Sequence, residues 1–316
     1  MLNEIKSQLI MKIIFENIKN KRKLKVIKYS NYLKNKLNIS IKNYETYELL
    51  KVLNVVLDRN IEDIDIDYLG FYHPRNIQGI LKFLSKIEFK ELACLNISYN
   101  KIRSIDALEK YNFKKLQVLN LSHNIIRDIS VLEKTEFKEL TELDLCCNEI
   151  YHLDVLQNAN FKKMKILNLR NNKISNIDVL EKVDFKELNI LNLSKNNIKN
   201  INILSKVNFK ELKELYLMKN KISGINIFEK VDFKLLEKLD LNGNIIESIN
   251  VFEKVNFKNL KDLDLHCTYF KTDINIFLHF DKLKNSDIRF NCIYPKNDNN
   301  YFTITELKSK ISYVRY

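Results

Sequence analysis

A 24-residue pattern runs without a gap from residue 89 to residue 280, and it constrains the fold more than any other feature of the chain. Phenylalanine opens each of the eight copies, at positions 89, 113, 137, 161, 185, 209, 233 and 257. Within a copy, apolar residues fall at positions 1, 4, 7, 9, 14, 17 and 20. A period of this length predicts a solenoid, because each copy can bury its apolar face only against neighbouring copies.

The first half of a copy predicts a strand. In the copy that opens with Phe185, Leu191 and Leu193 alternate with polar neighbours, which is the two-residue period of a half-buried strand. Stacked copies then make a parallel sheet. Asparagine occupies position 12 of seven copies, where an inward amide can pair with turn backbone that no strand satisfies. The asparagines are Asn100, Asn124, Asn148, Asn172, Asn196, Asn220 and Asn244, and Thr268 ends the series.

The second half of a copy predicts short helical turns. The pairs Asp178/Glu181 and Asp184/Glu187 have the spacing of capping boxes at helix starts. We therefore expect two short turns per copy, some of them 3-10 helices, above a buried stack of the phenylalanines. Similar pairs are Asp106/Glu109, Ser130/Glu133, Asn226/Glu229 and Asn208/Glu211.

Copies of the type F-K-E-L-x-x-L-N-L-S-x-N-x-I-x-x-I resemble the leucine-rich repeat family, and they are similar to those of internalins and of the leucine-rich regulators of protein phosphatase 1. The resemblance covers the 192 residues from 89 to 280. It implies an α/β solenoid with a curved parallel sheet on the concave side and short helical turns on the convex side. It also implies a recognition module with no chemistry of its own.

Two flanking segments complete the predicted organisation. Residues 1–58 have helical periodicity and predict an α-helical N-terminal cap, which a solenoid needs to shield the apolar edge of its first coil. Residues 59–88 form a degenerate first repeat, in which the alternation from Ile61 to Ile66 predicts a strand. Residues 281–316 are predicted to be a C-terminal capping repeat.

The N-terminal segment also resembles the F-box, a helical module that tethers a leucine-rich receptor to the Skp adaptor of a ubiquitin ligase. This resemblance implies a Skp-type adaptor as a partner, whereas a plain cap is the alternative that the same pattern supports. The apolar residues that carry the resemblance are Leu9, Ile13, Ile14, Ile18, Leu24, Ile27 and Leu33.

The net charge of +13 is unevenly placed along the chain. Residues 1–60 hold 13 Lys or Arg against 5 Asp or Glu, whereas residues 61–280 hold 33 against 31. The basic excess therefore gathers near the N-terminus, where it predicts nucleic-acid or ribosome binding as an alternative function. The residues that would carry it are Lys21, Arg22, Lys23, Lys25 and Lys28.

Cysteine usage predicts a reducing compartment. The five cysteines, at 94, 146, 147, 267 and 292, are odd in number and lack CxxC spacing, so we expect reduced thiols and a cytoplasmic location. Glu4, Lys6, Lys12 and Glu16 interrupt the first apolar stretch, which argues against a secretory leader. No apolar run approaches the roughly 18 residues of a membrane span, so we expect no membrane contact.

The candidate binding surface is the concave face, where positions 6, 8 and 10 of each copy are expected to point outward. Position 8 is mostly Asn or Asp, which is the consensus of the family. The prediction therefore rests on the residues of these three positions that differ from the residue common there. A tyrosine and a methionine flanked by charge resemble an interface hot spot with a polar rim. The predicted partner-binding residues are Glu142, Asp144, Arg170, Tyr216, Met218, Asp240, Asp264 and His266.

Catalysis and metal binding find little support in the sequence. Cys146 and Cys147 lie near His123 across one coil, but no orienting acid or ligand spacing accompanies them. The four glycines include no phosphate loop. We therefore expect a non-catalytic protein-binding scaffold with no metal or cofactor, monomeric outside its complex, and acting as a ubiquitin-ligase substrate receptor or a phosphatase regulator.

Overall fold

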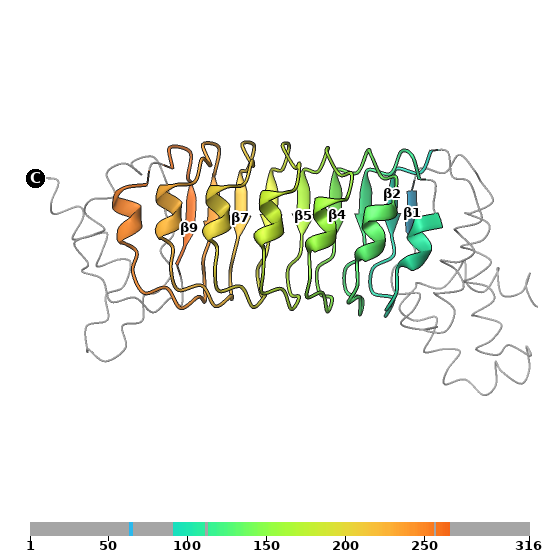
Figure 1. Ribbon diagram of the computed structural model, residues 1–316, viewed down its shortest axis with the longest axis horizontal. Helices are drawn as coiled ribbons and strands as arrows, with labels where there is room; N and C mark the ends of the chain where they lie inside the picture. Colours follow the sequence, from blue (N-terminus) through green and yellow to red (C-terminus); the bar gives the residue numbers. More distant parts are fainter. Residues whose placement is uncertain (1–62, 66–90, 111–112, 256, 266–316) are drawn as a thin grey trace, which may run out of the picture. The chain divides into compact units, whose positions relative to one another are not determined.

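The computed structural model describes residues 63–65, 91–110, 113–255 and 257–265, all within the second of the chain's two units, Glu62–Tyr316. Its backbone forms a stack of coils with a row of strands on one side and a row of 3-10 helices on the other (Figure 1). Each coil begins at the phenylalanine that opens its repeat copy. No helix among the described residues is long and apolar enough to cross a bilayer.

The strands pair in sequence order, all parallel, in one sheet. The register places each residue opposite its counterpart 24 positions later, so Leu191 faces Leu215. Every repeat strand buries its middle residue and leaves the two flanking residues half-buried, as the alternation predicted. The strands are β1 (Asp63–Asp65), β2 (Cys94–Asn96), β3 (Val118–Asn120), β4 (Glu142–Asp144), β5 (Ile166–Asn168), β6 (Ile190–Asn192), β7 (Glu214–Tyr216), β8 (Lys238–Asp240) and β9 (Asp262–Asp264).

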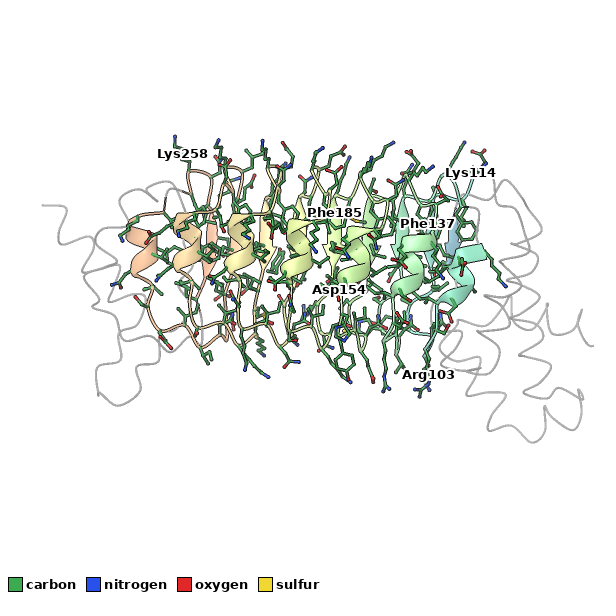
Figure 2. The ribbon with its side chains drawn as sticks, in the orientation of Figure 1. Arg103, Lys114, Phe137, Asp154, Phe185 and Lys258 are labelled. Atoms are coloured by element: carbon green, nitrogen blue, oxygen red, sulfur yellow. The ribbon has the colours of Figure 1, made fainter. Side chains whose placement is uncertain are left out.

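The core fills the space between the sheet and the 3-10 helices. The seven described repeat phenylalanines, from Phe113 to Phe257, are no more than 4% exposed. Phe113 and Phe137 stack with their ring centres 6.2 Å apart, and Figure 2 shows Phe137 and Phe185 within the coils. The predicted aromatic stack is therefore confirmed for these residues.

The predicted asparagine ladder is also confirmed. Asn196 is 7% exposed, and its Oδ1 accepts the amide of Ile174 from the preceding coil at 3.1 Å. Its Nδ2 donates to the carbonyls of Leu169 and Leu193 at 3.0 and 2.9 Å. One side chain thus satisfies turn backbone in two adjacent coils, which stabilises the stack.

The return path contains one 3-10 helix per coil, and the prediction of two helical turns was wrong. The second expected turn, after Phe185, is a single bend in which the amide of Leu188 donates to the Phe185 carbonyl at 3.1 Å. Both residues are buried, and only two residues separate them, which leaves no length for a helix. The helices are η1 (Asp106–Lys110), η2 (Ser130–Lys134), η3 (Asp154–Gln157), η4 (Asp178–Glu181), η5 (Asn202–Ser205), η6 (Asn226–Glu229) and η7 (Asn250–Glu253).

The capping boxes were also misassigned. The residue before η4 is Ile177, and no side chain caps the helix there. Instead, the Asn176 side chain at position 16 accepts the amide of Asp178 at 2.6 Å, and Asn200 does the same for Asn202 at 2.8 Å. A 3-10 helix this short has no third-position residue free to cap its own start. The side chain two residues before the first helical residue accepts that residue's amide instead, as in a turn.

The predicted N-terminal cap (residues 1–58) and C-terminal capping repeat (residues 281–316) lie outside the described residues. Of the predicted degenerate first repeat, residues 59–88, the structure describes β1, which falls within the segment where alternation predicted a strand. β1 pairs with β2 through Ile64 and Leu95, a spacing of 31 residues in place of 24.

Candidate functional site

The candidate surface is the outer face of the sheet, which we call the sheet face and define by repeat positions 6, 8 and 10. Positions 6 and 8 flank the buried leucine of each strand and are half-buried in every described repeat. Position 10 differs from the prediction because Ser98, Ser122 and Ser194 there are buried. Only Arg170, Met218 and Asn242 are partly exposed at position 10 among the described coils.

Position 8 has a structural role in most coils. The side chain of Asn192 accepts the amide of Ser194 at 3.1 Å, and that of Asp240 accepts the amide of Asn242 at 3.0 Å. This turn explains the Asn or Asp consensus, because a short side-chain oxygen must reach the backbone two residues on. Tyr216 departs from the consensus, and a phenol ring cannot make the same local bond. Its presence therefore needs another explanation.

Tyr216 is the centre of a charged group. Its hydroxyl donates to Glu214 Oε2, and Lys238 Nζ lies 5.3 Å from the centre of its ring. Lys238 also pairs with Asp262 at 3.1 Å. Burial, together with the hydrogen bond to Glu214, raises the pKa of the Tyr216 phenol, so the ring stays neutral and available as a donor.

Two further carboxylates complete this group, which we call the Tyr216 cluster (Glu214, Tyr216, Lys238, Asp240, Asp262 and Asp264). Asp240 lies beside Tyr216 in the sheet register, and Asp264 lies beside Asp240. Burial raises the pKa of Asp240, and the charge of Asp264 adds to the effect. Four carboxylates against one lysine make this part of the sheet face acidic.

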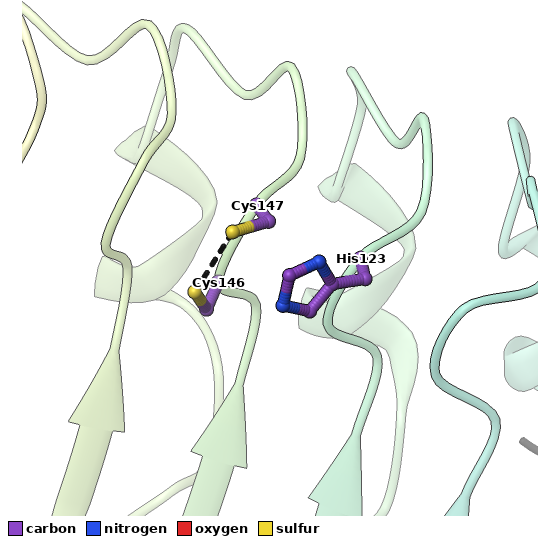
Figure 3. A group of neighbouring side chains, drawn as sticks. All are labelled: His123, Cys146 and Cys147. Atoms are coloured by element: carbon purple, nitrogen blue, oxygen red, sulfur yellow. Dashed lines mark hydrogen bonds between the residues drawn. The ribbon is translucent and has the colours of Figure 1, made fainter.

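A second group lies toward β4. Burial raises the pKa of Glu142 and of Asp144, the latter even though its Oδ1 accepts the amide of Cys146 at 2.8 Å. Cys146 is 9% exposed, and its Sγ lies 3.2 Å from that of Cys147. Burial is the main reason that the pKa of the Cys146 thiol rises to about 12. Figure 3 shows His123 of the preceding coil facing both thiols.

The structure thus divides the predicted site residues into two groups. Glu142, Asp144 and Arg170 lie at β4 and just after β5, whereas Tyr216, Met218, Asp240 and Asp264 lie from β7 to β9. Five strand spacings of about 4.8 Å separate β4 from β9, so the two ends lie roughly 24 Å apart. His266 and the basic residues Lys21, Arg22, Lys23, Lys25 and Lys28 lie outside the described residues.

Sequence reasoning missed a lysine of the Tyr216 cluster, and it placed His123 near Cys146 and Cys147 without predicting a site there. Lys238 was not selected, although it contacts Tyr216 and Asp262; it is the sole lysine at position 6 of the eight repeats, which was the available signal. The ligand atoms of His123, Cys146 and Cys147 lie within 4.8 Å of one another. Their signal was the repeat period itself, because His123 and Cys147 are 24 residues apart and therefore adjacent in the stack.

The lysines at position 2 form a ridge outside the sheet face. All seven described members are exposed, and Figure 2 shows Lys114 and Lys258 at the same edge. Several have an acidic neighbour, such as Asp184, which lies 3.2 Å from Lys186. Such exposed pairs contribute little to stability. We call these residues the lysine ridge.

Comparison with known families identifies the class of protein. A family model described as leucine-rich repeats in two copies matches residues 90–134, and a second leucine-rich repeat model matches residues 138–198. These matches identify residues 90–134 and 138–198 as leucine-rich repeats, and the parallel sheet and the asparagine ladder extend the same arrangement through the described coils. Such repeats are generally non-catalytic scaffolds and typically bind proteins.

Solved structures add particular relatives in fold. Internalin C2 of Listeria monocytogenes is similar over 68% of this chain and 84% of its own, with 18% identity and a TM-score of 0.51. The plant peptide hormone receptor RGFR1, solved in complex with RGF2, covers the same share with 19% identity and a TM-score of 0.52. The chain spans 34% of that receptor. A search of curated protein sequences gives no match.

Proposed function

We propose that the protein binds a protein partner through the sheet face, with the Tyr216 cluster as the centre of the interface. The observation that carries the proposal is Tyr216 itself, which replaces a structural Asn or Asp by an aromatic ring and surrounds it with charge. Aromatic residues in a charged rim dominate the binding energy of many interfaces. Met218, partly exposed two residues on, adds apolar contact area.

The partner should present basic groups. The Tyr216 cluster sets four carboxylates against Lys238, and that lysine is already paired with Asp262. A surface of this sign steers positively charged partners and repels acidic ones. We expect association to slow as salt rises, because exposed charges separated by more than about 10 Å are screened at 0.1 M ionic strength.

The experiment is partner capture from native cells by wild-type protein and two single variants. Tyr216→Ala should reduce the recovered partner at least tenfold, since truncating a hot-spot aromatic costs about 2 kcal/mol or more. Tyr151→Ala is the matched control because Tyr151 is 43% exposed and lies outside the sheet face. Equal recovery with Tyr216→Ala, at an unchanged melting temperature, would exclude the cluster as the binding centre.

Two specific scaffold roles stay predictions within this proposal: a ubiquitin-ligase substrate receptor and a phosphatase regulator. Recovery of a Skp-type adaptor with the full chain would support the first, and recovery of a phosphatase catalytic subunit the second. The nucleic-acid alternative rests on Lys21, Arg22, Lys23, Lys25 and Lys28. An RNA gel shift that disappears when these residues become Gln would support it instead.

We also propose a cytoplasmic location. Cys94, Cys146 and Cys147 are free thiols in the described structure, although two of them are 3.2 Å apart. Vicinal thiols persist in a reducing compartment and oxidise in an oxidising one. Fractionation of native cells tests this location directly.

A further inference from the structure

His123, Cys146 and Cys147 converge from two adjacent coils. Their imidazole nitrogen and thiol sulfurs all lie within 4.8 Å of one another, and no other such group occurs among the residues the structure describes (Figure 3). The two sulfurs are 3.2 Å apart. Position 10 carries Ser in three of the seven described coils, and among these coils only the one that begins at Phe137 has adjacent cysteines at positions 10 and 11. The cysteine pair is therefore a departure from the repeat, as Tyr216 is.

The backbone holds these three residues in place. The amide of His123 donates to the Cys146 carbonyl at 2.8 Å, and the amide of Cys147 donates to the Arg170 carbonyl at 2.8 Å. His123 and Cys147 both occupy the left-handed region, with φ of 53° and 56°. The His123 ring also stacks on Tyr99, with ring centres 4.0 Å apart. The side chains are thus oriented by the coil stack.

The chemistry of this group fits a zinc ion. Thiolate and imidazole ligands select Zn²⁺ or Cu⁺ over hard cations such as Mg²⁺ and Ca²⁺. In a tetrahedral site with Zn–S distances of about 2.3 Å, two sulfurs lie roughly 3.8 Å apart. The observed 3.2 Å therefore needs only a small rotation of one thiol. We propose that His123, Cys146 and Cys147 form a three-ligand zinc site, with a water at the fourth, solvent-facing position.

Neighbouring side chains support the ligands. Asn171 Nδ2 donates to Cys147 Sγ at 3.3 Å, which fixes the direction of this sulfur. Asp144 accepts the Cys146 amide at 2.8 Å and so anchors the turn that carries both cysteines. Since the ligands come from two coils, a bound ion bridges them and stabilises the stack by mass action.

The test is a zinc titration of the full chain, purified under reductant, with a cobalt titration alongside it. Three ligand variants each use a residue that the same repeat position carries in another coil: Cys146→Ser as in Ser122, Cys147→Asn as in Asn171, and His123→Asn likewise. These changes should preserve the fold. Cys94→Ser is the control, because Cys94 lies on β2 away from the group.

We expect one zinc per chain in the wild type and in Cys94→Ser, with the visible absorption of tetrahedral thiolate-bound Co²⁺. Each ligand variant should bind roughly 100-fold more weakly or worse, since even outer-shell changes cost 10- to 100-fold. Zinc should also slow alkylation of Cys146 and Cys147, measured by mass spectrometry of their peptide.

Three outcomes would overturn the site. Unchanged affinity in the Cys146→Ser, Cys147→Asn double variant would show that any bound zinc lies elsewhere on the chain. Unchanged affinity in His123→Asn would remove the imidazole from the ligand set. A wild-type peptide 2 Da lighter, alkylated neither with nor without zinc, would identify a disulfide instead.

Discussion

The asparagine at position 12 joins each coil to its neighbour through hydrogen bonds of its side chain. Asn148, for example, accepts the amide of Ile126 at 3.0 Å and donates to the carbonyls of Leu121 and Leu145 at 3.0 Å each. Removing such a side chain strands buried donors and acceptors in two coils at once. Each stranded group costs about 1 to 3 kcal/mol.

Asn196→Ala should therefore lower the free energy of unfolding by about 2 to 4 kcal/mol, because the hydrogen bonds to Ile174, Leu169 and Leu193 are lost together. Urea denaturation measures the change. Asn197→Ala, at the next residue and half-buried, is the control and should stay within about 0.5 kcal/mol of wild type. Equal effects of the two variants would contradict the ladder.

The ionisation of Asp240 should make the stability of the fold depend on pH. Burial raises its pKa in the folded protein, so the folded state binds this proton more tightly than the unfolded state. Below the unfolded pKa of about 3.9, the Asp240 carboxyl is neutral in the folded protein, and its burial stabilises that form. As pH rises through the folded pKa, the carboxyl ionises and this contribution to the stability of the fold is lost. Asp240→Asn should thus gain stability relative to wild type at pH 7 and lose that advantage by pH 3. Paired denaturation curves at both pH values measure it, and a constant difference would refute it.

At the residue scale, the sequence predicted the residues that recur at fixed positions of the repeat. It did not predict contacts between different repeat positions in adjacent coils. The buried phenylalanines and asparagines recur at fixed positions, so the pattern placed them correctly. The contact between Lys238 and Tyr216 joins different repeat positions in adjacent coils, and side-chain reach decides it. The closeness of His123 to Cys147 was visible as one period, but their orientation depends on left-handed backbone at both residues.

The elements of this fold are short because each coil must close within 24 residues. Three-residue strands and four- or five-residue 3-10 helices gain little from their own hydrogen bonds, so packing and turn side chains decide their form. The spacing of the acidic residues predicted capping boxes, whereas the structure caps these helices with the side chain at position 16. Both patterns place polar residues at helix starts, and spacing alone does not separate an α-helical cap from a turn before a 3-10 helix.

Position 16 offers a test by gain of stability. η6 is preceded by Gly224, which has no side chain to accept the amide of Asn226, and a Cβ there would meet nothing within 4 Å. Gly224→Asn should stabilise the protein by about 1 kcal/mol, from a new cap and a less flexible unfolded chain. Gly224→Ala supplies only the second effect and should gain less. Thermal denaturation of both variants checks this, and a larger gain with Ala would refute the cap.

As a whole, the described part of the molecule is a linear stack. Strands pair only with their neighbours, and η1 to η7 also contact one another in sequence order. Stability in such a stack is close to a sum of coil and interface contributions. A defect in a central coil therefore weakens two interfaces, whereas one at an end weakens a single interface.

Phe185→Ala tests this arrangement. Phe185 is 2% exposed in a central coil, and its removal should cost about 3 to 5 kcal/mol through lost burial and the cavity left behind. The midpoint of urea denaturation should fall accordingly. An unchanged midpoint would show that the phenylalanine stack contributes nothing to the fold.

Hydroxyl-radical footprinting of the complex shows whether the sheet face binds the protein partner. Oxidation of Tyr216 and Met218 should fall on binding the captured partner, because an interface centred there covers both side chains. Oxidation of Tyr151, exposed and outside the sheet face, should not change. Protection of Tyr151 with unchanged oxidation of Tyr216 and Met218 would contradict binding at the sheet face and place the partner on another surface.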